Sequence, residues 1–111
     1  MTKKYLSMLG LARRAGRLAM GHDMVCDAIR KRKARLLVFT ADSSARLREE
    51  IGRLTDRYCP ALPCVTISET MDEIHCAIGY RAGVMAVNDS NFSARIAELT
   101  EQEENAYGNK N

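Results

Sequence analysis

The spacing of apolar residues along the chain predicts an alternation of helices and strands. In several segments apolar side chains recur every three or four residues, the period of a helix that buries one face. The continuous run Leu36-Leu37-Val38-Phe39 is instead typical of a strand buried on both sides, which implies helices on both faces of a sheet. Helices are expected at 3–14, 21–33, 44–58, 70–79 and 90–100. Strands are expected at 18–20, 34–41, 65–67 and 83–87.

Residues that cap or end helices support these boundaries. The Asp-Ser-Ser run at 42–44 offers N-caps for the third helix, and Thr70 with Glu73 has the spacing of a capping box. Gly16 and Gly79 follow the last apolar positions of their helices. The alternation predicts an α/β fold, a three-layer α/β/α sandwich with a small, mostly parallel or mixed four-stranded sheet.

Chain length and composition fit one domain. The 111 residues, 46% hydrophobic and 28% charged, suffice to bury a core without disulfides or metals. We expect a single domain over residues 1–100 and a polar, disordered tail over 101–111. No apolar run approaches the ~20 residues that span a bilayer, and the N-terminus lacks the apolar block of a signal peptide. These features predict a cytoplasmic protein with no membrane partner.

Positive charge is concentrated at one end of the chain. The net charge is only +3, but residues 1–35 carry ten Lys and Arg against two Asp, a local net charge of +8. Such a concentration favours a polyanionic partner, because each phosphate that is neutralised releases counterions. A basic surface that is merely solvated is the alternative.

The sequence contains no recognisable catalytic constellation. It has no G-x-G-x-x-G, P-loop or H-E-x-x-H motif. The four cysteines form no C-x-x-C pair and are interpreted as buried or spare thiols. We expect no enzymatic activity, no cofactor and no bound metal. A small metal- or thiol-dependent enzyme is kept as the last of three hypotheses. Its candidate groups are His22, Cys26, His75 and Cys76.

The glycine-led start of the second helix is the best candidate for a ligand site. Helix N-termini present free N–H groups and a partial positive charge, which attract phosphates and polar base edges. Alternatively, Gly21 merely turns the chain and Asp23 caps the helix, and the residues alone leave both interpretations open. Candidate phosphate contacts surround this helix in the sequence: Arg13, Arg14, Arg17 and Lys31 to Lys33.

Four segments, taken in order, match the pattern of a known family. The run G-H-D-M-V-C-D-A-I-R at 21–30 is followed by K-A-R-L-L-V-F-T-A-D at 33–42. The segment D-E-I-H-C-A-I-G at 72–79 is similar to a Leu-Gly-x-Ala-x-Gly helix, and 83–92 to a last strand and closing helix. Over residues 3–99 the chain resembles the ribosomal protein L-seven-Ae family of kink-turn RNA binders, above all its short bacterial members outside the standard ribosomal set.

The resemblance implies a non-enzymatic protein that grips a sharply bent RNA with the N-terminus of its second helix and the loop before its last strand. Such an interface is physically reasonable, because bulged RNA exposes its base edges. Kink-turn or ribosomal RNA is the expected partner, with further protein partners in a ribonucleoprotein. The candidate RNA-binding residues are Arg14, Arg17, Gly21, His22, Asp23, Met24, Asp27, Lys31, Tyr80, Arg81, Ala82 and Gly83.

This sequence departs from the family pattern at three positions. The pattern Gly-x-Asn-Glu-x-x-Lys has Asp23, Met24 and Asp27 in place of its Asn, Glu and Lys. Aspartate accepts hydrogen bonds but has no amide to donate, and Asp27 puts a negative charge where a cation would face RNA. A second hypothesis is therefore a protein-interaction module that kept the fold and lost kink-turn recognition, using Met20 and Met24 as adaptable apolar contacts.

Overall fold

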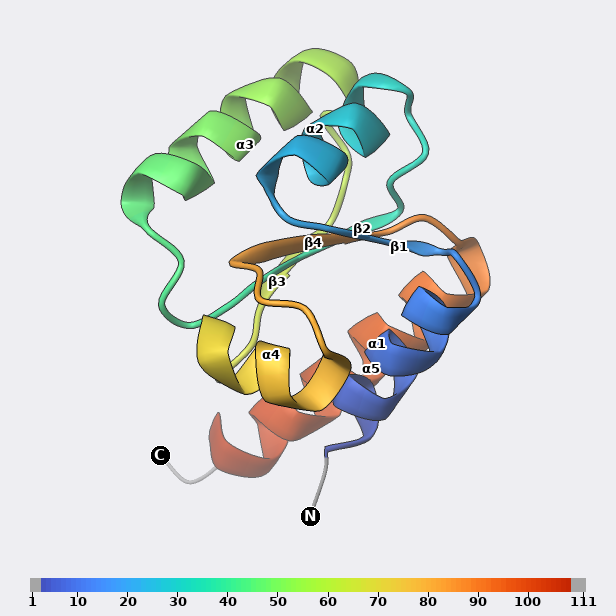
Figure 1. Ribbon diagram of the computed structural model, residues 1–111, viewed down its shortest axis with the longest axis vertical. Coiled ribbons are helices and arrows are strands. Elements are labelled where there is room, and N and C mark those ends of the chain that lie inside the picture. Colours follow the sequence, from blue (N-terminus) through green and yellow to red (C-terminus); the bar gives the residue numbers. More distant parts are fainter. Residues whose placement is uncertain (1–2, 109–111) are drawn as a thin grey trace.

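The computed structural model describes residues 3–108, with side chains described for residues 3–103. Helices and strands alternate along this part of the chain, as the sequence predicts (Figure 1). The helices are α1 (Lys4–Arg14), α2 (His22–Arg30), α3 (Ala45–Tyr58), α4 (Met71–Ile78) and α5 (Ser90–Gly108). The strands are β1 (Leu18–Met20), β2 (Leu36–Phe39), β3 (Cys64–Thr66) and β4 (Val84–Val87).

The four strands form one mixed sheet in the order β1-β4-β2-β3. Strands β2 and β3 are parallel, whereas β4 runs antiparallel to both β1 and β2. Of the two expected arrangements, mostly parallel or mixed, the structure has the mixed one. The pattern of apolar residues left this open, because a buried strand has the same composition whichever way it runs.

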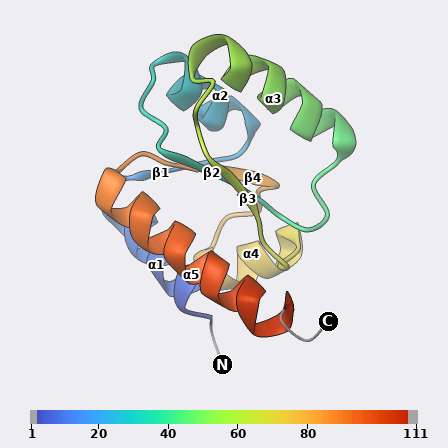
Figure 2. The same ribbon diagram turned by 180° about the vertical axis from the view of Figure 1, so that it is seen from behind.

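Alternate residues of the central strands supply two separate cores. Leu36 and Val38 of β2 pack with α1, α4 and α5, whereas Leu37 and Phe39 pack with α2 and α3. This follows from the two-residue period of a strand, which sends neighbouring side chains to opposite faces. Figures 1 and 2 show the resulting layers from opposite sides, with α2 and α3 above the sheet and α1, α4 and α5 below it. The predicted α/β/α sandwich is confirmed.

The helix caps follow the sequence prediction closely. The Ser44 side chain accepts a hydrogen bond from the backbone N–H of Leu47 at 3.1 Å. Thr70 and Glu73 form both halves of a capping box at the start of α4. Helix α4 ends at Gly79, whose φ of +96° is the left-handed conformation that favours glycine.

Helix α5 extends further than the sequence predicts. It runs to Gly108, so residues 101–108 continue the helix where a disordered tail is expected. No glycine or proline interrupts it before Gly108, and Glu103 lies 3.7 Å from the Nζ of Lys3, which ties the helix to the start of α1. The last part of the predicted tail, 109–111, lies outside the described residues. None of the helices in the described chain is long and apolar enough to cross a membrane.

Candidate nucleic-acid interface

Helix α2 begins at Gly21 with an open N-terminus. Gly21 has φ +91° and ψ 165°, a combination that essentially only glycine adopts without strain. Its N–H donates to the carbonyl of Val84 at 3.0 Å, which fixes the start of α2 against the first residue of β4. Within residues 3–103, the N–H groups of His22, Asp23 and Met24 have no hydrogen-bond acceptor. Three donors and the positive end of the helix dipole are thus available to a ligand.

The loop between α4 and β4, residues 79–83, lies beside this helix start. A Cβ placed on Gly21 would be 3.8 Å from Cε1 of Tyr80, so the Tyr80 ring borders the start of α2. Tyr80 is 47% exposed. Arg13 supports it from the end of α1: its Nη1 donates to the carbonyl of Ile78 at 2.7 Å, and its guanidinium lies 5.9 Å from the Tyr80 ring centroid. The fold therefore joins the two segments that the family resemblance pairs.

The role of Arg13 was missed by sequence reasoning, which grouped it with phosphate contacts. Arg13 is exposed, and its guanidinium contacts the end of α4 and the Tyr80 ring. Gly79 makes room for it, since a Cβ at that position would lie only 3.0 Å from Nη1 of Arg13. Arg14 is chemically identical and adjacent in sequence, so only the tertiary structure separates their roles.

His22 links the start of α2 to helix α3. Its Nδ1 lies 2.8 Å from Oδ1 of Asp23, and its Nε2 lies 2.7 Å from Oε2 of Glu50. These hydrogen bonds, that with Asp23 first and that with Glu50 second, raise the pKa of His22 above its usual value. The Asp23 side chain is 99% exposed, so its second oxygen remains available as an acceptor. Glu50 comes from another helix, and no signal in the sequence connects it with His22.

Three predicted contact residues take part in exposed ion pairs. The Nζ of Lys31 lies 3.1 Å from Oδ2 of Asp27, one helical turn away, and so partly neutralises the negative charge of Asp27. In the α4–β4 loop, Nε of Arg81 lies 2.9 Å from Oδ1 of Asp72. Exposed pairs contribute only about 0.2–1 kcal/mol, so Lys31 and Arg81 can exchange these partners for phosphates at small cost.

Ala82 and Gly83, the last two residues of the α4–β4 loop, pack against the rest of the protein. Ala82 is 4% exposed and belongs to the core. A Cβ on Gly83 would lie 3.3 Å from both Cδ2 of Leu47 and Sδ of Met71, so glycine permits the close approach of this chain to α3 and α4. The Ala82 side chain is therefore buried, whereas Gly83 stays partly exposed, and both remain predicted contacts.

Arg14 and Arg17 are exposed, but the fold does not bring Arg17 to the start of α2. The strand β1 separates Arg17 from Gly21 by four residues of extended chain, about 13 Å. The carbonyl of Arg17 accepts a hydrogen bond from the N–H of Asn88, beyond the end of β4, whereas Gly21 bonds to Val84 at its beginning. Arg17 therefore lies at the opposite end of the strand pair from the open helix start.

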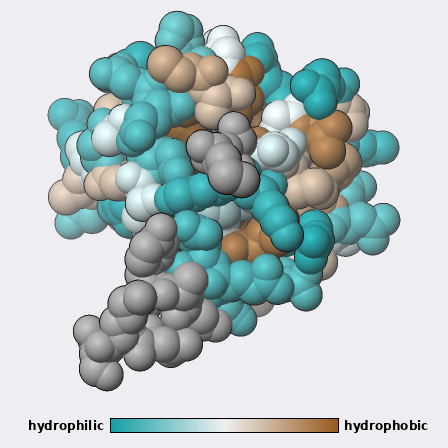
Figure 3. All heavy atoms as spheres, turned by 90° about the horizontal axis from the view of Figure 1, so that it is seen from below, coloured by the Kyte–Doolittle hydropathy of each residue, from teal (hydrophilic) through white to brown (hydrophobic). Residues whose placement is uncertain are grey.

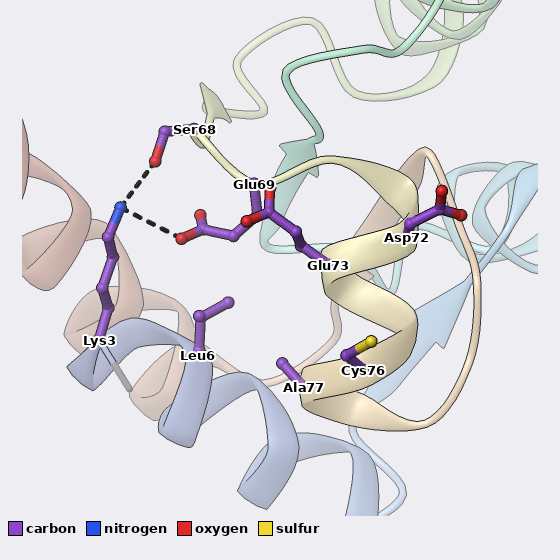
Figure 4. Close-up of a pocket in the computed structure, with 8 residues that line it drawn as sticks. All are labelled: Lys3, Leu6, Ser68, Glu69, Asp72, Glu73, Cys76 and Ala77. Carbon is purple, nitrogen blue, oxygen red and sulfur yellow. Dashed lines mark hydrogen bonds and ion pairs between the residues drawn. The ribbon is translucent and has the colours of Figure 1, made fainter. Parts of the chain in front are cut away.

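A groove between α1 and α4, with a volume of about 580 Å³, has a charge that disfavours polyanions. Glu69, Asp72 and Glu73 line it, and Figure 4 shows the carboxylates of Glu69 and Glu73 on the side of Lys3, whereas that of Asp72 points away. Its one cation is already occupied, because the Nζ of Lys3 lies 2.7 Å from Oγ of Ser68 and 3.1 Å from Oε2 of Glu69. The same side of the molecule, seen from below in Figure 3, is mostly hydrophilic with separate small hydrophobic areas.

The groups of the enzyme hypothesis do not converge. The Sγ of Cys26 lies 3.7 Å from Nε2 of His22, but His75 and Cys76 belong to α4, on the opposite face of the sheet. Burial raises the pKa of the Cys26 thiol, which disfavours the reactive thiolate. Among the described residues no three His, Cys, Asp or Glu side chains are grouped to hold a metal ion.

The order of the elements and the junction of α2 with the α4–β4 loop define an L-seven-Ae-like fold, and solved structures with a similar fold are known. The fold is similar to that of a protein of unknown function from Bacillus halodurans, with a TM-score of 0.79 and 27% identity over 90% of this chain and 99% of that one. It is also similar to the Giardia lamblia 15.5 kD RNA binding protein, with a TM-score of 0.68 and 14% identity over 89% of this chain and 83% of that one. The family resemblance in the sequence is thus confirmed at the level of the fold.

Two curated proteins are similar to the chain over nearly its whole length. Both are called RNA-binding protein YlxQ. The one from Enterococcus faecium is 28% identical over 99 residues, covering 89% of this chain and 93% of its own length. The one from Bacillus subtilis (strain 168) is 29% identical over 97 residues, covering 86% of this chain and 94% of its own length. No family model matches the chain.

Proposed function

We propose that this chain is a non-enzymatic RNA-binding protein that recognises structured RNA of the kink-turn type. The observation that carries the proposal is the junction of the open N-terminus of α2 with the exposed ring of Tyr80. The near full-length similarity to two proteins called RNA-binding protein YlxQ supports RNA as the ligand class.

The chemistry of a kinked RNA fits this junction. A kink splays bases out of the stack, so their edges and faces become accessible to a protein. The N–H groups at the start of α2 donate to phosphate or base acceptors, and the Asp23 carboxylate accepts from base amino groups. The Tyr80 ring offers a stacking face, which is worth about 1–3 kcal/mol per base. Arg81 contributes a phosphate contact beside the junction, and the exposed Arg14, Arg17 and Lys31 contribute contacts to RNA that extends beyond it.

Because Asp23 and Met24 replace the Asn and Glu of the family pattern, the affinity for RNA in this proposal depends on other groups. A good bidentate contact to a base edge is worth about 1–3 kcal/mol, and Asp23 and Met24 do not reproduce those of an Asn-Glu pair. Met24, with 60% of its surface exposed, adds apolar contact instead. We therefore assign the specificity of this chain to the backbone donors of α2 and to Tyr80, which recognise the shape of the kink.

The test is binding to a kink-turn RNA and to a straight duplex of matched composition, across a series of salt concentrations. Wild-type protein should prefer the kinked RNA, and Tyr80→Ala should lower that affinity roughly 10- to 100-fold while leaving the weak duplex affinity unchanged. Leu11→Ala is the matched control, because Leu11 is exposed to a similar extent and lies on α1. Equal affinity of the wild-type protein for both RNAs would contradict kink recognition.

The exposure of Met24 favours one alternative, a protein-interaction module. An exposed methionine beside an exposed aspartate suits a partner protein with an apolar, basic surface. A partner that stays bound to the purified full chain after nuclease treatment, and is lost with Met24→Glu, would support this function. Loss of every partner on nuclease treatment would contradict it.

A further inference from the structure

A hollow between α2 and α3 is lined by three guanidinium groups. Its volume is about 270 Å³, and Arg30 comes from the last turn of α2 while Arg53 and Arg57 lie one turn apart on α3. Leu54 and the buried Cys26 complete its apolar part. The three positive charges around this hollow repel one another. An anion bound among them reduces that electrostatic repulsion.

The described chain offers these three guanidiniums no ion pair and no hydrogen bond, and only that of Arg57 contacts an aromatic ring, that of Tyr58. Within residues 3–103, Arg30, Arg53 and Arg57 form no ion pair and donate no hydrogen bond, whereas other arginines do both. The one carboxylate in the hollow, that of Glu50, is hydrogen-bonded to Nε2 of His22. The positive charge of the hollow is thus available to an external ligand.

The hollow is part of a firmly packed junction. Ile51 and Thr55 of α3 are buried beneath it. The ends of the two helices are tied by Nε of Arg32, which donates to the carbonyl of Tyr58 at 3.2 Å, and by a weaker contact from Sγ of Cys59 to the carbonyl of Ile29 at 3.6 Å. The Arg57 guanidinium itself rests on the Tyr58 ring, 5.6 Å from its centroid.

The hollow continues the proposed RNA surface along α2. His22, Cys26 and Arg30 are spaced four residues apart, so they lie on one side of α2, the side that faces α3. Arg30 comes nine residues after Gly21, which corresponds to about 14 Å along a helix. A ligand that is held at the open helix start must therefore extend by about this distance to reach the guanidiniums.

We propose that the Arg30–Arg53–Arg57 hollow is a second RNA contact, which binds phosphates of the stem next to the kink. The inference rests on the proposed function and extends its footprint. Guanidinium groups suit this ligand, because each presents paired N–H donors that match two phosphate oxygens. An RNA stem carries phosphates in a regular row, so one stem can satisfy all three cations. Recognition here depends on backbone charge and is independent of base sequence.

The experiment compares two kink-turn RNAs, one with a minimal flanking stem and one with the stem lengthened, in binding to the full chain. Wild-type protein should bind the longer RNA more tightly and with a steeper salt dependence. Arg53→Ala with Arg57→Ala should remove most of this gain, lowering affinity for the long RNA roughly tenfold and its salt slope by roughly 2. Affinity for the short RNA should fall less than about threefold.

Two further variants isolate the contact. Lys4→Ala with Arg95→Ala removes the same charge from exposed positions on α1 and α5, across the sheet, and should leave the advantage of the longer stem intact. Arg53→Lys with Arg57→Lys keeps the charge and should retain the salt slope while losing part of the affinity. Equal effects of the alanine pair on both RNAs, or no effect on either, would overturn the second contact while kink recognition stands. Failure of wild-type protein to distinguish kinked from straight RNA would instead overturn the proposed function.

Discussion

The N-termini of α2 and α4 lie on opposite faces of the sheet and are built in opposite ways. At α4 the Oγ1 of Thr70 accepts from the N–H of Glu73 at 3.2 Å, and Oε1 of Glu73 accepts from the N–H of Thr70 at 3.0 Å. Oδ1 of Asp42 accepts from the N–H of Met71 at 3.0 Å. At α2 the cap is Gly21, which has no side chain, and the following N–H groups have no acceptor within the described residues.

The comparison separates a helix end that is capped by side chains from one that we propose is left open for binding. A side-chain cap contributes typically about 1 kcal/mol, and α2 forgoes that contribution. The charged residues near the two helix N-termini differ in the same way. Carboxylates surround the start of α4, and hydrogen bonds from Thr40 and Met71 outweigh desolvation and lower the pKa of Asp42. At the start of α2 the neighbour is instead the exposed Tyr80 ring, and the arginine-lined hollow lies further along the same helix.

Gly21→Ala should give the largest effect on stability. The backbone of Gly21 lies in a region that is essentially restricted to glycine, so any side chain should cost about 1–3 kcal/mol of unfolding free energy. Crowding adds little, because the added Cβ would meet only the Tyr80 ring at an ordinary contact distance of 3.8 Å. Chemical denaturation measures the change.

Gly52→Ala is the matched control. Gly52 lies in the interior of α3, where a Cβ would have no atom within 4 Å. This substitution should raise the unfolding free energy by about 0.5–1 kcal/mol, because alanine favours the helix. Similar effects of the two substitutions would mean that the conformation at Gly21 carries no special cost.

Thr70→Ala should act only on stability. Loss of the Thr70 hydroxyl leaves the N–H of Glu73 without its acceptor, at a cost of about 1 kcal/mol. Affinity for kinked RNA should be unchanged, measured on the folded protein well below its melting temperature. A loss of RNA affinity comparable to that expected for Tyr80→Ala would remove the distinction between the two helix ends.

The smallest expected effect is a pH dependence of stability that comes from the hydrogen bond between His22 of α2 and Glu50 of α3. Because the folded pKa of His22 is raised, its stabilising contribution is fully present below the usual value of 6.5 and is lost as pH rises through the folded pKa. The melting temperature of wild-type protein should therefore exceed that of His22→Gln most at low pH, and the difference should shrink at high pH. An NMR titration of His22 with a midpoint at or below 6.5 would contradict the raised pKa.

Several features of the fold could be predicted because their causes are local. The continuous run Leu36 to Phe39 indicated a strand with helices on both sides, and the structure has both cores. The pair Thr70 and Glu73 indicated a capping box, which needs only four consecutive residues. The extension of α5 was missed because its last turns are polar, and polarity by itself does not distinguish an exposed helix from a disordered tail.

The candidate site could be predicted only in part. The start of α2 at Gly21 was a candidate from the residues alone, Tyr80 was added through the family resemblance, and the structure places the two together. Ala82 was assigned to ligand contact through the same resemblance, and that its side chain is buried depends on packing that the sequence does not reveal.

The sequence by itself determined the order and approximate positions of the helices and strands, the glycine-led start of α2 and the excess of positive charge near the N-terminus. The tertiary structure alone decided that β4 enters the sheet antiparallel between β1 and β2, and that Arg13 supports Tyr80 while Arg14 stays exposed. It also placed Arg30 with Arg53 and Arg57 around one hollow. The physical reason is range: caps and periodicity depend on neighbours within a few residues, whereas contacts between distant segments depend on how whole elements pack.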